Sequence, residues 1–160
     1  MTSPATRSAM KGHAEHLGRD FEAWIGLFAE DAVLQFPHFA SLGWPTETRG
    51  RDAIKAGLGR FLESVDDFVL ENVLVYEAAD PDVVFAEYEV HARVKASGRR
   101  YDQSYIAMLT TRDGKIVRLR EFPDMIAVAK AFLPEGLATL AASAARLGDE
   151  ATSKIERQSA

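Results

Sequence analysis

The first third of the chain carries hydrophobic side chains at the spacing of an α-helix. Between residues 8 and 29 they recur three and four positions apart, which predicts an amphipathic helix interrupted near Gly18. A short strand is expected at 31–36, and a second amphipathic helix at 51–64. The stretch 37–50 holds two prolines and two glycines, which predicts a loop, and its aromatic residues make that loop unusually apolar.

From residue 66 onward the hydrophobic period changes to two, which is typical of strands buried on one face. Turn sequences divide this region into predicted strands at 67–77, 83–95, 100–111 and 115–122. A short helix is expected at 123–132, and Pro134 is typical of the first turn of another. We therefore expect an α+β protein with one domain over residues 1–133 and a C-terminal helical tail over 134–160. Its helices would pack on one face of a curved, mostly antiparallel sheet that encloses a pocket.

Composition and charge narrow the possible functions. The 160 residues include no cysteine, which excludes disulfides, thiolate metal sites and cysteine nucleophiles. Acidic residues outnumber basic ones by 24 to 19, with no dense Lys/Arg cluster, so we expect no nucleic-acid partner. Without a long apolar run or an apolar leader we expect no membrane contact and a cytoplasmic protein. Phosphate-loop, dinucleotide and serine-hydrolase motifs are also absent from the sequence, so we expect neither a cofactor nor a metal.

Glu121 is the leading candidate for a catalytic group. Alternation along the strand at 115–122 places Val117, Leu119 and Glu121 on one side, and we take this side as the interior because helices are expected on one face only. Burial opposes the ionisation of a carboxyl group, so a buried Glu121 could transfer protons near neutral pH. The alternative is an ion pair with an arginine that only fixes the end of the sheet.

The neighbours of Glu121 depend on the turn at Asp113-Gly114. A two-residue turn places Ile106 opposite Glu121, whereas a three-residue turn with Gly114 as a bulge shifts the pairing by one residue. The sequence leaves both registers open. They predict different interior faces: Asp102 and Ser104 for the shorter turn, or Tyr101, Gln103 and Tyr105 for the longer one.

Histidines offer further candidates. On the strand at 83–95, His91 and Glu87 share the outer face, either as an acid/base pair or, more simply, as part of a polar surface toward water or a partner subunit. His13 and His16 are three residues apart on the first helix, and we expect both at the surface because no carboxylates converge with them as metal ligands. His38, in the apolar loop, either reaches over the pocket as a proton carrier or makes only a loop contact.

Aromatic residues are expected to form the pocket wall for a flat, apolar or aromatic ligand. Trp44 and Phe39 are the best of them, because bulky aromatic residues in a Gly/Pro-rich loop are harder to explain as core. Tyr88 belongs to the buried set of its strand. The complete set of expected substrate-binding residues is Trp24, His38, Trp44, Phe61, Tyr88, Tyr101, Asp102 and Tyr105.

Three segments resemble a known family: Phe28-Ala-Glu-Asp-Ala-Val33, Arg49-Gly-Arg-Asp-Ala-Ile54 and Asp113-Gly-Lys-Ile-Val-Arg-Leu-Arg-Glu-Phe122. Together with the order of elements, over about residues 10–132, they look like the SnoaL-like branch of the nuclear transport factor 2-like superfamily. Within that branch, residues 75–81, the Glu87/Glu89/His91 pattern, Tyr101-Asp102 and Arg120-Glu121-Phe122 are most similar to phenazine-biosynthesis A/B-type proteins.

The resemblance implies a cone-shaped α+β (cystatin-like) fold, often dimeric, whose deep pocket acts on small cyclic or polyketide-like molecules without a cofactor. It also implies an acid/base glutamate at the position of Glu121, which in the phenazine-type proteins helps to condense two ketone-bearing rings through an imine. Those proteins place a histidine and a serine where this chain has Gly57 and Phe61, so a more apolar pocket with different chemistry is expected here.

Two functions from different classes follow. The first is a cofactor-independent isomerase, cyclase or dehydratase that uses Glu121, assisted by Tyr101 or Asp102 and by His38. The second is a non-catalytic ligand-binding or scaffold subunit of the same fold. In both cases we expect a small apolar or aromatic ligand and a homodimer. A protein–protein adaptor that uses the outer face of the sheet is a third possibility.

Overall fold

The computed structural model describes residues 1–138, which form a six-stranded sheet in the order β2-β1-β6-β5-β4-β3. Neighbouring strands are antiparallel except β1 and β6, which are parallel. The strands are β1 (Phe28–Gln35), β2 (Glu47–Arg49), β3 (Val65–Glu77), β4 (Val83–Val94), β5 (Arg100–Arg112) and β6 (Lys115–Pro123).

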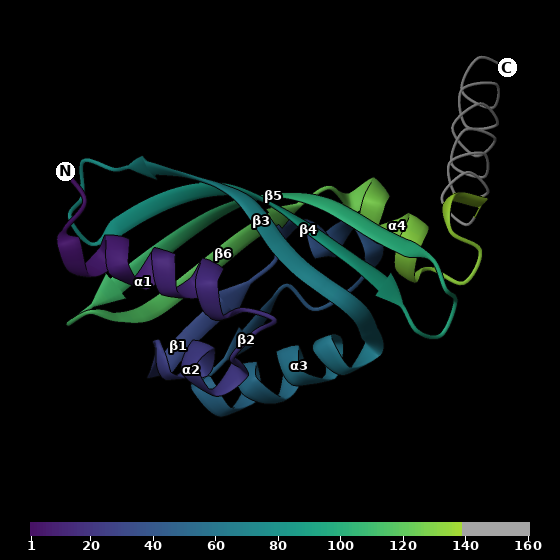
Figure 1. The fold of residues 1–160 in the computed structure, drawn as a ribbon, viewed down its shortest axis with the longest axis horizontal. Coiled ribbons are helices and arrows are strands. Elements are labelled where there is room, and N and C mark those ends of the chain that lie inside the picture. The colour runs from purple at the N-terminus through teal and green to yellow at the C-terminus, as the bar shows by residue number, and fades with distance from the viewer. Residues whose placement is uncertain (139–160) are drawn as a thin grey trace, which may run out of the picture.

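The helices gather on one face of this sheet, the inner face (Figure 1). They are α1 (Pro4–His16), α2 (Phe21–Gly26), the 3-10 helix η1 (Pro37–Leu42), α3 (Arg51–Ser64) and α4 (Met125–Phe132). Helix α1 packs on the long strands β3 to β6, α3 packs on β1, β2 and β3, and α4 packs on β5. The helices therefore bury the inner face, and the outer face is left uncovered by any element in residues 1–138.

Local signals explain where the helices begin and end. The side chains of Ser3, Asp20 and Asp124 accept hydrogen bonds from the first backbone N–H groups of α1, α2 and α4. Between α1 and α2 the chain turns at Gly18, whose φ of 79° favours glycine and whose absent side chain leaves room for the ring of Phe68. None of the helices within the described residues is long and apolar enough to cross a membrane.

The expected α+β architecture is confirmed, and four of the five predicted strands lie within two residues of their observed bounds. The first helical segment is shorter than expected, because Phe28 already begins β1 and is fully buried. The apolar loop at 37–50 contains η1 and the short strand β2, which pairs with β1. Most of the predicted C-terminal tail, from residue 139 on, lies outside the described residues.

The β5–β6 hairpin combines features of both registers considered above. Arg112 pairs with Lys115 across a two-residue turn at Asp113-Gly114, in which both residues have positive φ. The pairing then shifts by one residue, because Val117 is a bulge between the Thr111–Ile116 and Thr110–Arg118 pairs. Beyond the bulge Glu121 lies opposite Ala107 rather than Ile106, the partner that the two-residue turn alone would give it.

The bulge decides which side chains face inward. Ile116 is fully buried while Val117 is only half-buried, so the expectation that Val117 lies inside is also wrong. Leu119 and Glu121 are buried as expected, because they follow the bulge. On β5 the inward set is Tyr101, Gln103 and Tyr105 rather than Asp102 and Ser104.

Candidate active site

A cavity of about 300 Å³ lies between the inner face of the sheet and the helices η1, α3 and α4. Helix α3 shows why it is open: Ile54 is its only fully buried residue, and its other apolar side chains, such as Leu58 and Phe61, border the cavity. The lining is mostly apolar and aromatic: Leu17, Trp24, Leu34, Phe36, Phe39, Trp44, Pro45, Thr48, Ile54, Gly57, Leu58, Phe61, Phe68, Tyr88, Val90, Tyr101, Tyr105, Glu121, Val128 and Phe132. Among the lining residues within 1–138, Glu121 is the one ionisable group apart from the tyrosines.

A chain of hydrogen bonds runs from the core to the carboxyl group of Glu121. The indole N–H of Trp24, which can only donate, donates to Nδ1 of His13 at 3.0 Å. Nε2 of His13 therefore carries the ring proton and donates to the hydroxyl of Tyr88 at 3.2 Å. Tyr88 in turn donates to Oε1 of Glu121 in a short hydrogen bond. The direction of every bond in the chain follows from the first donor.

Burial sets the protonation states along this chain. It raises the pKa of Glu121 to about 7, although the hydrogen bond from Tyr88 acts in the opposite direction. It lowers the pKa of His13 to about 4, so this imidazole is neutral at physiological pH. It also raises the pKa of Tyr88 well above its usual value, with the charge of Glu121 as a second cause. The carboxyl group is thus the group in the chain that titrates near pH 7.

A second polar group in the cavity consists of two phenols and an amide. The hydroxyls of Tyr101 and Tyr105 are 2.6 Å apart, and Nε2 of Gln103 lies 3.4 Å from the hydroxyl of Tyr101. Gln103 is held by the backbone of Asp124, to which it donates at 3.0 Å and from which it accepts at 2.7 Å. Burial raises the pKa of Tyr101 to about 12 and that of Tyr105 well above its usual value, so both phenols remain protonated.

The structure brings together seven of the nine residues expected at the site: Trp24, Trp44, Phe61, Tyr88, Tyr101, Tyr105 and Glu121 all line the cavity. Gly57 and Phe61, the positions that differ from the phenazine-type pattern, line it as well.

His38 and Asp102 do not line the cavity. The His38 ring is exposed and packs edge-on against Phe122, with 5.4 Å between the ring centroids. Of the two alternatives, His38 therefore makes only a contact from its loop and does not reach over the cavity. Asp102 lies on the outer face, where it contacts His91 and Arg100, because the Val117 bulge moves it out of the interior register. Placing Asp102 in the pocket was therefore wrong.

His13 is the residue that sequence reasoning missed. It was expected at the surface, but it is fully buried and bonded at both ring nitrogens. The signal was present in the spacing, because Met10, His13 and Leu17 lie three and four residues apart and form the buried stripe of α1. A histidine on such a stripe needs buried hydrogen-bond partners, which Trp24 and Tyr88 provide.

A curved sheet covered by helices on one face and closed around one apolar cavity defines the nuclear transport factor 2-like fold, also called ketosteroid isomerase-like. The chain belongs to the SnoaL-like domain family, which matches residues 13–119.

Two relatives are similar in sequence. The uncharacterized protein YesE of Bacillus subtilis is 34% identical over 128 residues, which cover 80% of this chain and 86% of YesE. The uncharacterized PhzA/B-like protein PA3332 of Pseudomonas aeruginosa is 38% identical over 103 residues, or 64% of this chain and 72% of the relative. The expected relationship to phenazine-type proteins is therefore confirmed.

A solved structure shows the same architecture. The crystal structure of a "Putative Isomerase" from Bacillus subtilis superposes with a TM-score of 0.72 at 30% identity, and the match covers 80% of this chain and 92% of that one.

Proposed function

We propose that the protein is a cofactor-independent enzyme of the isomerase, cyclase or dehydratase type, in which Glu121 moves a proton on a ketone-bearing ring. The observation that carries the proposal is one carboxyl group in a mostly apolar and aromatic cavity, with its pKa raised to about 7 by burial. Near neutral pH both protonation states of Glu121 are then populated, as a group that takes and returns a proton requires. The family and the Bacillus subtilis structure support this type of chemistry.

The proposed reaction begins with ionised Glu121. Its carboxylate takes a proton from the carbon next to the ring carbonyl. The electron pair of that C–H bond forms a carbon–carbon double bond, and the π pair of the carbonyl moves to its oxygen to give an enolate. In a ring with a β,γ double bond the enolate is conjugated with that bond, and Glu121 returns the proton at the γ carbon, which moves the double bond and isomerises the ring. In a ring with a β-hydroxyl, Glu121 gives the proton to that hydroxyl, which leaves as water while the α,β double bond forms. Because Tyr88 donates to Oε1, the other oxygen of the carboxyl group, Oε2, is the one assigned to the substrate.

Stabilisation of the enolate is assigned to Tyr105. In this proposal Tyr101 accepts from Gln103 and acts as the donor in its hydrogen bond with Tyr105. The proton of Tyr105 is then free to donate to a substrate oxygen. A protonated phenol in a low-dielectric cavity is an effective partner for a developing negative charge.

Cavity size and lining support a small, flat substrate. A volume of about 300 Å³ lies at the lower end of small-molecule sites and suits one or two fused rings. The stacked rings of Phe36 and Phe39, with Trp44 edge-on at 5.4 Å from Phe39, offer aromatic surface on the side of η1.

The test is solvent proton exchange. Cyclic ketones and polyketide-like phenols that raise the melting temperature of the protein are incubated with it in D2O, and loss of the α-proton signal is followed by NMR. We expect exchange that falls at least 100-fold in Glu121→Gln and is unchanged in Glu87→Gln, a control on the outer face. Equal exchange in parent and Glu121→Gln would rule out the assigned role of Glu121.

The second candidate function is a non-catalytic ligand-binding subunit. It is favoured by Gly57 and Phe61, which remove two polar side chains that the phenazine-type proteins place in the pocket. Ligands that bind without exchange, and whose binding is the same at pH 6 and pH 8, would support it over the enzyme.

We also propose that the protein is a homodimer assembled through the outer face of the sheet. Apolar side chains are exposed there, among them Leu74 at 56%, Ile106 at 52% and Tyr76 at 48%. Large exposed apolar side chains on one face are typical of a surface that a partner covers.

A further inference from the structure

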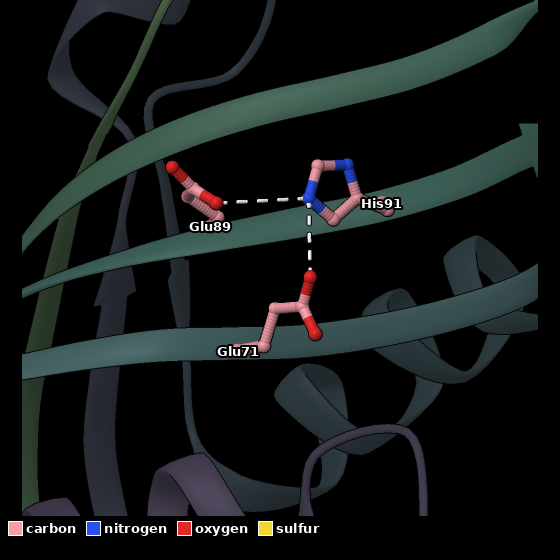
Figure 2. Close-up of side chains that lie close together, drawn as sticks. All are labelled: Glu71, Glu89 and His91. Atoms are coloured by element: carbon pink, nitrogen blue, oxygen red, sulfur yellow. Dashed lines mark ion pairs between the residues drawn. The ribbon is translucent and has the colours of Figure 1, made fainter.

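A cluster of metal-ligating side chains lies on the outer face of the sheet, opposite the cavity. Figure 2 shows Nε2 of His91, on β4, facing the carboxylates of Glu71, on β3, and Glu89, on β4. The distances are 3.6 Å to Oε1 of Glu71 and 3.8 Å to Oε2 of Glu89. All three side chains are partly exposed in the single chain.

Asp102 determines which nitrogen of His91 faces the two glutamates as an acceptor. Oδ1 of Asp102 lies 2.8 Å from Nδ1 of His91, and Arg100 donates to both oxygens of the same carboxylate. Because both of its oxygens are paired with the Arg100 guanidinium, this carboxylate accepts hydrogen bonds. Nδ1 therefore carries a proton and donates it to Asp102. Nε2 is then the ring nitrogen that faces the two carboxylates, where it can bind a cation together with them.

The pairing of β3 with β4 also indicates a cation site. Glu71 and Glu89 lie directly opposite each other on β3 and β4, and like charges in that position destabilise a sheet. Asn72, at a bulge with φ of 54°, donates to Oε2 of Glu89 at 2.7 Å and so orients that oxygen. With Asp102 and Arg100 included, the cluster has three carboxylates and one guanidinium. Its net charge is therefore negative, and a divalent cation offsets it.

We propose that Glu71, Glu89 and His91 bind a divalent first-row transition metal ion, with Zn²⁺ as the representative. Ligands about 2.1 Å from a tetrahedral centre are roughly 3.4 Å apart, close to the two distances given above. One imidazole and two carboxylates suit such an ion, whereas Mg²⁺ and Ca²⁺ prefer oxygen ligands only. The carboxylate of Asp102 behind His91 is the usual outer-shell partner of a metal-binding histidine. Three protein ligands leave one position for water or another ligand.

The site is separate from the cavity, because its ligands project from the opposite face of the sheet to Glu121. A failure of the metal proposal therefore leaves the proposed enzyme untouched, and the reverse also holds.

The test is titration of the tag-free protein, in the oligomeric state in which it is purified, with Zn²⁺ by calorimetry at pH 7.5. We expect one site per chain, affinity reduced at least tenfold in His91→Ala, Glu71→Gln and Glu89→Gln, and 10- to 100-fold in Asp102→Asn. His38→Gln and Glu87→Gln are matched controls at exposed positions and should bind like the parent. Mg²⁺ should give no binding heat at the same concentrations.

A second readout distinguishes the metal from a proton on His91. On addition of Zn²⁺, the ¹⁵N NMR signal of Nε2 of His91 should shift while Nδ1 stays protonated. Co²⁺ should give the visible absorption of a four- or five-coordinate ion, and this absorption should be absent in His91→Ala. The proposal is overturned if the ring stays doubly protonated and unchanged on adding Zn²⁺, or if His91→Ala and Glu89→Gln bind Zn²⁺ within twofold of the parent.

Discussion

The indole N–H of Trp24 donates to Nδ1 of His13 at 3.0 Å, and this bond fixes which nitrogen of a fully buried histidine carries the proton. A core tryptophan on α2 thereby sets the direction of a hydrogen-bond chain that ends on the carboxyl group of Glu121. The orientation of the proposed catalytic group therefore depends on side chains from two helices, α1 and α2, and one strand, β4. A substitution at each of these hydrogen bonds can test this dependence.

Replacing Tyr88 by Phe should move the pH dependence of Glu121 upward. The hydrogen bond from Tyr88 lowers the pKa of Glu121, so its removal adds to the increase that burial already causes. We expect the acid limb of the exchange rate, or of ligand binding, to shift to higher pH by up to about one unit. Tyr105→Phe, which has no hydrogen bond to Glu121, should lower the rate without moving that limb; equal shifts in both variants would contradict the assignment.

Glu121→Gln should make the protein more stable at alkaline pH. Between pH 4.5 and 7 the native state holds a proton on Glu121 that the unfolded state has lost, so the free energy of unfolding of the parent falls as pH rises. From pH 4 to pH 8 the stability difference should change by about 3 kcal/mol in favour of the variant. Urea unfolding at several pH values measures it, and a constant difference would show that the pKa of Glu121 is not raised.

His13 should make the free energy of unfolding depend on pH in the opposite direction. Its pKa is lowered to about 4 by burial, so between pH 6.5 and 4 the unfolded state gains a proton that the native state does not bind. Stability from this residue therefore falls as pH falls, and in the parent it offsets the trend from Glu121. The Glu121→Gln variant should reveal it as a loss of stability on acidification below pH 6.5. His13→Gln added to that variant should remove most of this loss, and a double variant that remains equally acid-sensitive would point to other groups.

Alanine substitutions at two glycines of α3 should distinguish an effect on protein stability from an effect on ligand affinity. A Cβ at Gly57 would meet nothing within 4 Å, and one at Gly59 would meet only the ring of Phe21 at 3.6 Å. Alanine at either position should stabilise the helix by roughly 0.5–1 kcal/mol. Only Gly57 lines the cavity, so ligand affinity should fall in Gly57→Ala and remain unchanged in Gly59→Ala. Thermal unfolding with and without ligand measures both effects.

The proposed dimer can be tested by a charge on the outer face. Ile106→Asp places a carboxylate among the exposed apolar side chains of that face and should convert the dimer to a monomer in light scattering. Ile126→Asp, at a residue of α4 that is exposed to a similar degree, should leave the dimer intact. A monomeric parent, or a dimer that survives Ile106→Asp, would place the interface elsewhere or exclude it.

Most of the fold could be predicted, because periodicity reports directly on which side chains are buried. Helix α3 was predicted over residues 51–64, and it spans Arg51–Ser64. The register of the β5–β6 hairpin was beyond reach, because the turn residues specify the turn while the shift occurs at Val117, where no glycine or proline marks it. Asp102 was misplaced for that reason, whereas Glu121 was placed on the correct face because Leu119 and Glu121 both follow the bulge.

The candidate site was predicted only as far as its apolar walls and its carboxyl group. Burial of His13 depends on partners from other elements, since Trp24 lies on α2 and Tyr88 on β4. Sequence spacing can place a histidine on the buried stripe of a helix, but it cannot show whether other elements provide two hydrogen-bond partners for its ring. Polar networks in a core are therefore harder to predict from one sequence than the core itself.

The bulge at Val117 also constrains how this chain can change in length. A single insertion or deletion between Arg118 and Glu121 would exchange the two faces of the end of β6, so that Arg120 or Phe122 would enter the cavity and the glutamate would turn to the solvent side. Deletion of Val117 itself would only remove the bulge and would leave Glu121 opposite Ala107. A single insertion or deletion in the loop at 95–99 would leave Glu121 where it is. Length variation among homologous chains is thus expected to be tolerated in the loop at 95–99 and selected against in the part of β6 just before Glu121.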